Sequence, residues 1–415
     1  MDQAKETRDE VVVVYSESSA GPLVPNGANG EHERAEWQKQ LRSARRLVIK
    51  LGTGIVTNDA GGFSVERIGP IVSAITGLKQ EGRQVVLVSS GAVGLGAGHL
   101  GLSSSRLNEL VTRQACAAVG QSLLMHAYEQ LFSVQGIRIA QVLLTAEDFS
   151  DWTRYQNLRR TMERLLKLGV LPVVNENDTV SIAELESIGA SGQRVFSDND
   201  RLAALVMSKL EAEVLVLLTN VDGLLAKAPE VNSKSPSPVV PFVSEITPQL
   251  KALASGPMTR GRGGMITKLE AAQIAMCSGF CVIANGGLPN TLPEIFAGKP
   301  TGTLFVSPSR MPGKRRWIAF ATNVRGRLTV NDGAREAILL GKASLLASGV
   351  IEVNDQFAAL DVVSILDANG QEFARGIVNC DSRKALQLIQ SSDKKRQRAR
   401  DHVLVTRDNI VLNPA

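Results

Sequence analysis

The sequence predicts an α/β protein with a mostly parallel, open sheet sandwiched by helices and a small β-rich domain after it. Two observations predict this fold class. From residue 46 onward, short apolar runs alternate with longer segments of helical periodicity, and beyond about residue 315 shorter strands separated by Asn-Gly and Asp-Gly turns replace that alternation. Regular alternation of strand and helix favours parallel strands covered on both faces, whereas closely spaced strands with tight turns favour antiparallel pairing.

Composition excludes several classes of protein. The chain has 415 residues, 44% hydrophobic and 21% charged, which is enough apolar material for more than one domain core. Aromatic residues make up only 4%, which argues against a binder of single-stranded nucleic acid that stacks bases. No apolar run approaches membrane-spanning length, so we expect a cytoplasmic protein without a membrane partner. The four cysteines lie mostly in apolar runs and are expected to be free thiols.

The first domain is expected over residues 44–306, after a disordered extension at residues 1–43 that is rich in Ser, Gly, Pro and charge. The apolar runs predict strands at 46–52, 84–88, 137–144, 170–174, 213–218, 281–284 and 302–306. The helical periodicity predicts helices at 64–81, 108–132, 155–168, 200–210, 269–278 and 289–297. Residues 226–243 contain many Pro and Ser and are interpreted as a surface excursion.

The second domain is expected over residues 315–390, after a linker at 307–314 with the sequence SPSRMPGK. Strands are predicted at 318–321, 326–330, 362–366 and 372–378, and helices at 334–340 and 382–389. Residues 391–415 contain a run of Lys and Arg and are interpreted as a solvated basic tail.

Two polar clusters mark a candidate site in the first domain. Asn175, Glu176, Asn177 and Asp178 follow the strand that ends at Val174, and a second cluster leads into the next helix with Asp198, Asn199 and Asp200. An open α/β sheet binds its ligands at the carboxyl ends of its strands. Carboxylates and amides together suit a small zwitterion such as an amino acid. The alternative is two surface turns, since Asn and Asp favour turns and helix N-caps.

Glycine-rich segments after other strands indicate a phosphate site. Lys50 is followed by Gly52 and Gly54, and Ser90 is followed by Gly91. A further loop, TRGRGGMITK, ends at Lys268 and leads into a helix. Backbone N–H groups at such positions bind anions, although the same residues also serve as ordinary turns and caps. Lysines, phosphate loops and a polar acceptor site together predict phosphoryl transfer. A carboxylate acceptor needs no general base because it is already ionised at neutral pH, and lysines with Mg²⁺ would offset the repulsion between two anions.

The ordered motifs resemble one family closely. VIKLGTG, VSSGAV, AAVGQ, VNENDTV, SDND, LLTN-VDGL, GRGGMITK-LEAA and GTLF together resemble the glutamate 5-kinases of the amino-acid kinase superfamily, and the segment after about residue 315, with KRRWIAF, resembles a PUA domain. The resemblance covers about residues 46 to 390. It implies ATP-dependent phosphorylation of the side-chain carboxylate of L-glutamate, the first step of proline biosynthesis, with ATP and Mg²⁺ as cofactors.

The resemblance also implies roles for individual residues. Lys50 and Lys268 would neutralise the transferring phosphoryl group, and Asp200 would hold both lysines; no residue is expected to bind metal directly. The substrate-binding set would be Ser90, Gly91, Asn175, Asp178, Asp198 and Asn199. The nucleotide-binding set would be Lys50, Gly52, Gly54, Thr219, Asn220, Arg262, Gly263, Gly264, Met265, Ile266, Thr267 and Lys268.

The sequence departs from the family pattern in places. Ser197 stands where Gly is common, Asn220 where Asp is common, Leu225 where Tyr is frequent and Arg262 where a smaller residue is frequent, and residues 189–194 lengthen a loop. Alternatives are another kinase of the superfamily, such as an N-acetylglutamate kinase, or an RNA-binding protein acting through the PUA-like domain. We also expect a homo-oligomer and a separate glutamyl-phosphate reductase as a partner.

Overall fold

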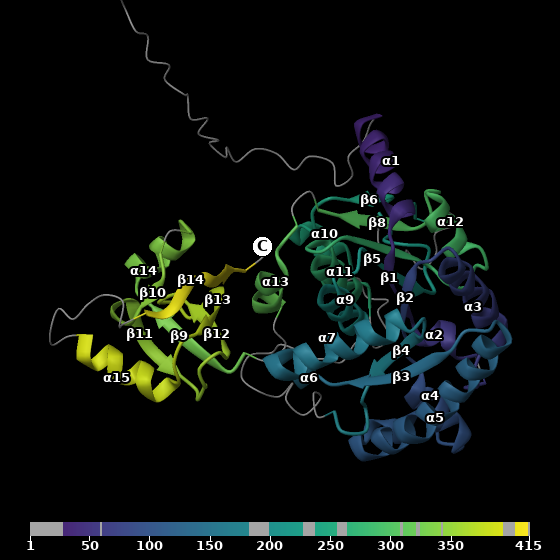
Figure 1. Ribbon diagram of the computed structural model, residues 1–415, viewed down its shortest axis with the longest axis horizontal. Coiled ribbons are helices and arrows are strands. Elements are labelled where there is room, and N and C mark those ends of the chain that lie inside the picture. The colour runs from purple at the N-terminus through teal and green to yellow at the C-terminus, as the bar shows by residue number, and fades with distance from the viewer. Residues whose placement is uncertain are drawn as a thin grey trace, which may run out of the picture.

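The computed structural model describes residues 28–58, 60–181, 199–226, 237–254, 264–307, 310–320, 324–341, 343–392 and 403–413. They form two sheets, one of eight strands and one of six. Figure 1 shows helices on both faces of the larger sheet and the smaller sheet beyond helix α13 (Gly313–Phe320). The predicted fold class, a mostly parallel helix-covered sheet followed by a β-rich domain, is confirmed.

The first sheet has the order β3-β4-β2-β1-β5-β7-β8-β6. The strands from β3 to β7 run parallel, whereas β8 runs antiparallel to β7. Their bounds are β1 (Arg46–Leu51), β2 (Gln84–Val88), β3 (Ile139–Leu144), β4 (Leu171–Glu176), β5 (Val214–Thr219), β6 (Phe242–Val243), β7 (Phe280–Asn285) and β8 (Thr303–Val306). The chain leaves β1 towards β2 on one side and later returns to β5 on the other. A sheet of this kind binds ligands at such a reversal of strand order.

Side chains of the central strands alternate between two buried cores. Leu47 and Ile49 enter one core, and Val48 enters the other. The first core is completed by α1 (Ala28–Ser43), α2 (Thr53–Val56), α3 (Val65–Gln80), α4 (Ala92–His99), α5 (Leu110–Val134) and α12 (Thr291–Ala297). The second is completed by α6 (Glu147–Ser150), α7 (Trp152–Lys167), α9 (Asn199–Leu210), α10 (Pro248–Ala254) and α11 (Met265–Met276). A 3₁₀ helix, η1 (Ser104–Asn108), precedes α5.

Helices α4 and α5 cross at a distance that only glycine permits. A Cβ atom added to Gly120 would lie 1.7 Å from the Ala92 carbonyl oxygen, and one added to Gly96 would lie 1.9 Å from that of Cys116. The glycines at this crossing therefore serve a close contact between two helices of the same domain. This contact fixes α5 against the loop that follows β2.

The second sheet has the order β10-β14-β13-β12-β9-β11, in which only β12 and β9 are parallel. Its strands are β9 (Gly326–Val330), β10 (Leu345–Leu346), β11 (Val350–Asn354), β12 (Val362–Leu366), β13 (Glu372–Val378) and β14 (Val403–Leu412). Helices α14 (Asp332–Leu339) and α15 (Ser382–Ser392) and the 3₁₀ helix η2 (Ala347–Gly349) accompany them. The Asn331 side chain accepts a hydrogen bond from the Ala334 N–H group and so caps α14.

Several expectations are wrong at the ends of the chain. Residues 28–43, expected to be disordered, form α1, because Trp37 and Leu41 pack into the core beside Phe280. Residues 403–412, expected in a solvated tail, form β14, which lies between β13 and β10. Residues 1–27 and the Lys/Arg run at 394–400 lie outside the described residues.

Three internal expectations are also wrong. Residues 318–320 of the strand predicted at 318–321 form the end of helix α13, because a short apolar run fits one buried helical turn as well as a strand, and residue 321 lies outside the described residues. The surface excursion at 226–243 ends in buried strand β6, and residues 227–236 lie outside the described residues. Strand β4 continues through Asn175 and Glu176, which pair with β3 and are buried. In the described parts of the chain, the helices are too short or too polar to cross a membrane.

Lys209, near the end of α9, is a buried cation without a carboxylate partner. Its side chain is 2% exposed, and its Nζ lies 2.7 Å from the centroid of the Tyr155 ring. Within the described residues that Nζ has no hydrogen-bond partner. Burial, followed by the charge of Arg159, lowers the pKa of Lys209 to about 7, against the opposing effect of Glu163 and Glu211. The Tyr155 ring face offsets part of the cost of burying the ammonium group.

We predict that Lys209→Met raises the free energy of unfolding in a pH-dependent manner. An unfolded lysine keeps its proton up to about pH 10.4, so the cost of the buried ammonium is full below pH 7 and disappears as the pH rises towards 10. The gain from Lys209→Met should be about 1 to 3 kcal/mol at pH 6 and near zero at pH 10. Urea unfolding at pH 6, 8 and 10 measures it, with the exposed Lys167→Met as control. A gain that does not change with pH would contradict the prediction.

Candidate active site

A buried cluster of three charged side chains lies at the carboxyl end of the first sheet. Lys50 is the penultimate residue of β1, Asp200 is in the first turn of α9, and Lys268 is in the first turn of α11. The Asp200 carboxylate binds both lysines, with Oδ1 lying 2.6 Å from Lys50 Nζ and Oδ2 2.9 Å from Lys268 Nζ. Asp200 is fully buried, and the two lysines are 4% and 8% exposed. We call these three residues the charged cluster.

Electrostatics within the charged cluster keep the carboxylate ionised. Burial alone would raise the pKa of Asp200, but the ammonium groups of Lys50 and Lys268 outweigh burial and hold that pKa below its usual value. Thr267 Oγ1 lies 3.3 Å from Asp200 Oδ2 and 2.9 Å from the Gly264 carbonyl oxygen. The cluster carries two positive charges against one negative charge, so its net charge favours an anionic ligand.

Four uncharged side chains beside the charged cluster form a hydrogen-bonded network, which we call the amide cluster. Asn199 Nδ2 donates to Ser90 Oγ and to Asn175 Oδ1, both at 3.1 Å, and Asn175 Nδ2 donates to Gln121 Oε1 at 2.9 Å. These residues come from the loop after β2, the end of β4, the start of α9 and the middle of α5. Because Asn199 and Asp200 are adjacent in α9, the charged and amide clusters are neighbours.

Two buried polar atoms of the amide cluster point to a ligand. Within the described parts of the chain, Gln121 Nε2 and Asn199 Oδ1 have no hydrogen-bond partner. A buried donor and a buried acceptor left unpaired each cost about 1 to 3 kcal/mol, so such atoms are paired in the working protein. A small molecule that both accepts and donates hydrogen bonds fits them.

The loop after β2 is held in one conformation beside the amide cluster. Gly91 has φ of 96° and precedes helix α4, a conformation that favours glycine. A Cβ atom there would lie 3.1 Å from Val56 Cγ1, so the loop also packs against α2. Ser89 is tied back by hydrogen bonds from its N–H group to the Val174 carbonyl oxygen and between its hydroxyl and that of Tyr128. Ser90, whose hydroxyl accepts from Asn199, therefore lies on a fixed loop.

The structure places many of the other residues that the sequence singled out at strand ends and helix starts. Gly52 follows β1 and donates its N–H to the Leu218 carbonyl oxygen, Gly54 is in the first turn of α2, and Thr219 and Asn220 end the neighbouring β5. Gly264 precedes α11, and its first turn contains Met265, Ile266, Thr267 and Lys268. Asp178 lies in the turn after β4. Asp198, Arg262 and Gly263 lie outside the described residues.

Gln121 is the residue of the amide cluster that sequence reasoning did not identify. It lies in the middle of α5, 54 residues from its partner Asn175, and neither a turn nor a strand end marks it. The only signal is its place at the end of the motif AAVGQ.

Both domains are similar to known protein families. Residues 45–285 match the amino acid kinase family, and residues 326–398 match the PUA domain. A glutamate 5-kinase from Myxococcus xanthus is 45% identical over 345 residues, covering 82% of this chain and 88% of the relative. One from Bifidobacterium longum is 40% identical over 384 residues, covering 91% and 98%. A crystal structure of an isopentenyl phosphate kinase from T. acidophilum aligns with a TM-score of 0.43 at 18% identity, over 63% of this chain and 99% of that one.

We predict that Asp200→Asn strongly destabilises the protein. The amide keeps the shape of the side chain but leaves two buried ammonium groups without a counter-ion, and breaking a buried ion pair in this way costs about 3 to 5 kcal/mol. Urea unfolding monitored by circular dichroism measures the loss. Asp408→Asn, which removes a carboxylate that is 87% exposed, is the control and should change stability by less than about 0.5 kcal/mol. Equal stability of the two variants would show that the cluster does not depend on the carboxylate charge.

Proposed function

We propose, because this chain belongs to the glutamate 5-kinase family of amino acid kinases, that it transfers the γ-phosphoryl group of ATP to the side-chain carboxylate of L-glutamate. The product is L-glutamyl 5-phosphate, and the reaction is the first step of proline biosynthesis. The observation that carries the proposal is the buried charged cluster, with two lysines held by one aspartate where β1, α9 and α11 meet. Phosphoryl transfer to a carboxylate brings two anions together, and a site with net positive charge offsets their repulsion.

Lys50 and Lys268 are the residues that we assign to the phosphoryl group. Their ammonium groups would neutralise negative charge on the transferring oxygens, and Asp200 would keep both at fixed positions. The glutamate carboxylate attacks directly, since a carboxylate with a pKa of about 4.3 is ionised at neutral pH and needs no base. The first turn of α11, with the Gly264 to Lys268 segment, would bind the nucleotide phosphates through backbone N–H groups.

The amide cluster is the part that we assign to glutamate. Ser90, Asn175, Asn199 and Gln121 supply uncharged donors and acceptors, and the unpaired atoms of Gln121 and Asn199 support a ligand that both donates and accepts. Asp178, after β4, would accept from the substrate ammonium group. Mg²⁺ is expected to arrive bound to ATP, because it coordinates substrate phosphates and water more often than an all-protein cage.

Other expectations stay predictions. The acyl phosphate product is a reactive mixed anhydride, so a separate reductase is expected to consume it. A homo-oligomer, a cytoplasmic location and RNA binding through the PUA domain are likewise predicted from the sequence alone.

We predict that the protein releases ADP from ATP and Mg²⁺ with L-glutamate but hardly at all with N-acetylglutamate. The free ammonium group of glutamate can form an ion pair with the Asp178 carboxylate, whereas the uncharged acetamide of N-acetylglutamate cannot. A coupled ADP assay on both substrates, with a hydroxylamine trap for the acyl phosphate and a blank without acceptor, measures the preference. Equal turnover of the two substrates would rule out the proposed substrate.

We predict that Lys268→Ala lowers kcat by about a hundredfold or more, since one preorganised charge at a transition state contributes about 2.7 to 4 kcal/mol. The control is Lys299→Ala, which removes a lysine whose side chain is 62% exposed. Steady-state kinetics on protein shown to be folded measures both variants. If Lys268→Ala turns over at the rate of the control, the lysine only pairs with Asp200.

A further inference from the structure

Helix α9 connects the candidate active site to the junction between the two domains. Asn199 and Asp200 open it within the two site clusters, and at its other end Ser208 and Leu210 accept hydrogen bonds from Arg316 of α13 and Arg46 of β1. Its twelve residues span about 18 Å, and most of them are buried in the core. A displacement at its far end is therefore transmitted to Asp200.

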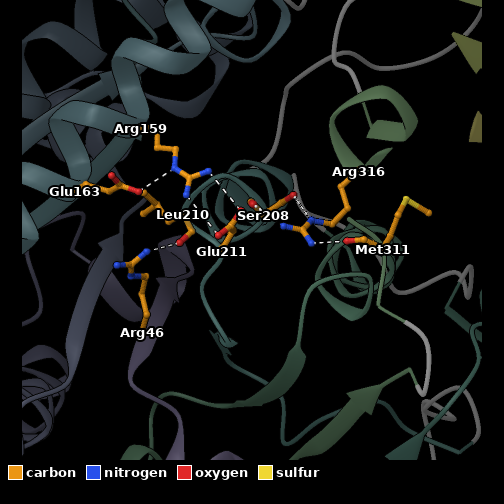
Figure 2. Close-up of polar contacts among 8 residues, drawn as sticks. All are labelled: Arg46, Arg159, Glu163, Ser208, Leu210, Glu211, Met311 and Arg316. Atoms are coloured by element: carbon orange, nitrogen blue, oxygen red, sulfur yellow. Dashed lines mark hydrogen bonds and ion pairs between the residues drawn. The ribbon is translucent and has the colours of Figure 1, made fainter. Parts of the chain in front are cut away.

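Two arginines bind the carbonyl groups at the far end of α9 (Figure 2). Arg316 of α13 donates from Nη2 to the Ser208 carbonyl oxygen and from Nε to Ser208 Oγ, both at 3.1 Å. Arg46 at the start of β1 donates from Nη1 to the Leu210 carbonyl oxygen at 2.5 Å. The last carbonyls of a helix lack intrahelical partners, and cations there also interact favourably with the helix dipole. Arg316 is buried, so its hydrogen bonds are protected from water.

The segment containing α13 also contacts the helix that carries Lys268. The Met311 N–H group donates to the carbonyl oxygen of Cys277, the residue that ends α11, at 2.9 Å. Arg316 Nη1 in turn donates to the Met311 carbonyl oxygen at 2.5 Å. One guanidinium group thus links the far end of the Asp200 helix to the far end of the Lys268 helix.

Neighbouring residues of α13 fix Arg316 from both domains. Trp317 Nε1 donates to the Phe149 carbonyl oxygen at 2.8 Å, and the Trp317 ring packs edge-on against Trp152. On the other side, Arg375 of β13 donates to the Ala319 carbonyl oxygen at 3.1 Å. Helix α13 is therefore packed between the kinase domain and the second sheet, as Figure 1 also shows.

We propose that Arg316 is a positioning residue for phosphoryl transfer: by clamping the far ends of α9 and α11, it keeps Asp200 aligned with Lys50 and Lys268. The proposal rests on the proposed function. It means that residues in the segment before the PUA domain help to hold the active-site helices in place. A misplacement of about 1 Å at a reacting group can lower a rate about a hundredfold, so a small shift of α9 is enough to matter.

The test compares Arg316→Ala with Arg315→Ala in the full-length protein. Arg315 lies on the same helix but is exposed, so its replacement removes the same charge without the clamp. For Arg316→Ala we expect kcat to fall at least tenfold, KM values for glutamate and ATP to stay within about threefold, and amide hydrogen exchange at the start of α9 to accelerate at least tenfold. Arg315→Ala should match the parent protein in all three.

A purely structural role for Arg316 gives a different result. It would lower the melting temperature of Arg316→Ala but leave kcat per folded molecule within twofold of the parent, and this would overturn the proposal. A fall in kcat without faster exchange in α9 would overturn it as well. If Arg316→Ala does not fold, Arg316→Gln, which keeps one amide donor, is judged by the same measurements. A parent protein without glutamate kinase activity would refute the proposed function instead, and the exchange comparison would still decide whether Arg316 holds α9.

Discussion

The ion pairs of Asp200 with Lys50 and Lys268 are the interaction on which the arrangement of this site depends. A carboxylate removed from water is tolerated only when cations offset the cost of its burial, and here two do so from different elements. The three residues are far apart in the chain, so the ion pairs hold together β1, α9 and α11. The same interaction leaves the cluster with a net positive charge, which is the property that phosphate chemistry uses. The same three charged residues therefore both stabilise the fold and provide the charge that phosphoryl transfer needs.

Strand β1 and helix α9 are joined at both ends. Lys50 meets Asp200 at one end, and Arg46 meets the Leu210 carbonyl oxygen at the other. Four residues of strand span about 13 Å and ten residues of helix about 15 Å, so the two distances match closely enough for both contacts to form at once. A pair of elements joined in this way resists sliding, which would separate the charges at the site. This match also explains why a residue as far from the site as Arg46 is relevant to it.

The main features of the fold were predictable from the sequence because they are local. Apolar runs and helical periodicity located the strands and helices of the first domain, and the rule that ligands bind at strand ends located both polar clusters. The individual site roles came from family resemblance, since periodicity carries no information on which distant residues meet. Gln121 lies in a helix interior without a local signal, and its contact with Asn175 exists only in the folded chain. The end of helix α13 has the pattern of a strand because its apolar run is too short for the two periodicities to differ, and its helical form depends on packing between two domains.

Strand β14 is the last strand of the second sheet to be synthesised. It lies between β10 and β13, and its residues Leu404, Val405, Ile410 and Val411 are buried. Before these residues leave the ribosome, β13 is an unpaired edge, and such edges are prone to pair with other chains. The sheet is therefore completed only after translation of residues 403–412, when the kinase domain has already emerged. A stop codon before residue 403 would leave β13 as a permanent edge strand, and the truncated product would be prone to aggregate.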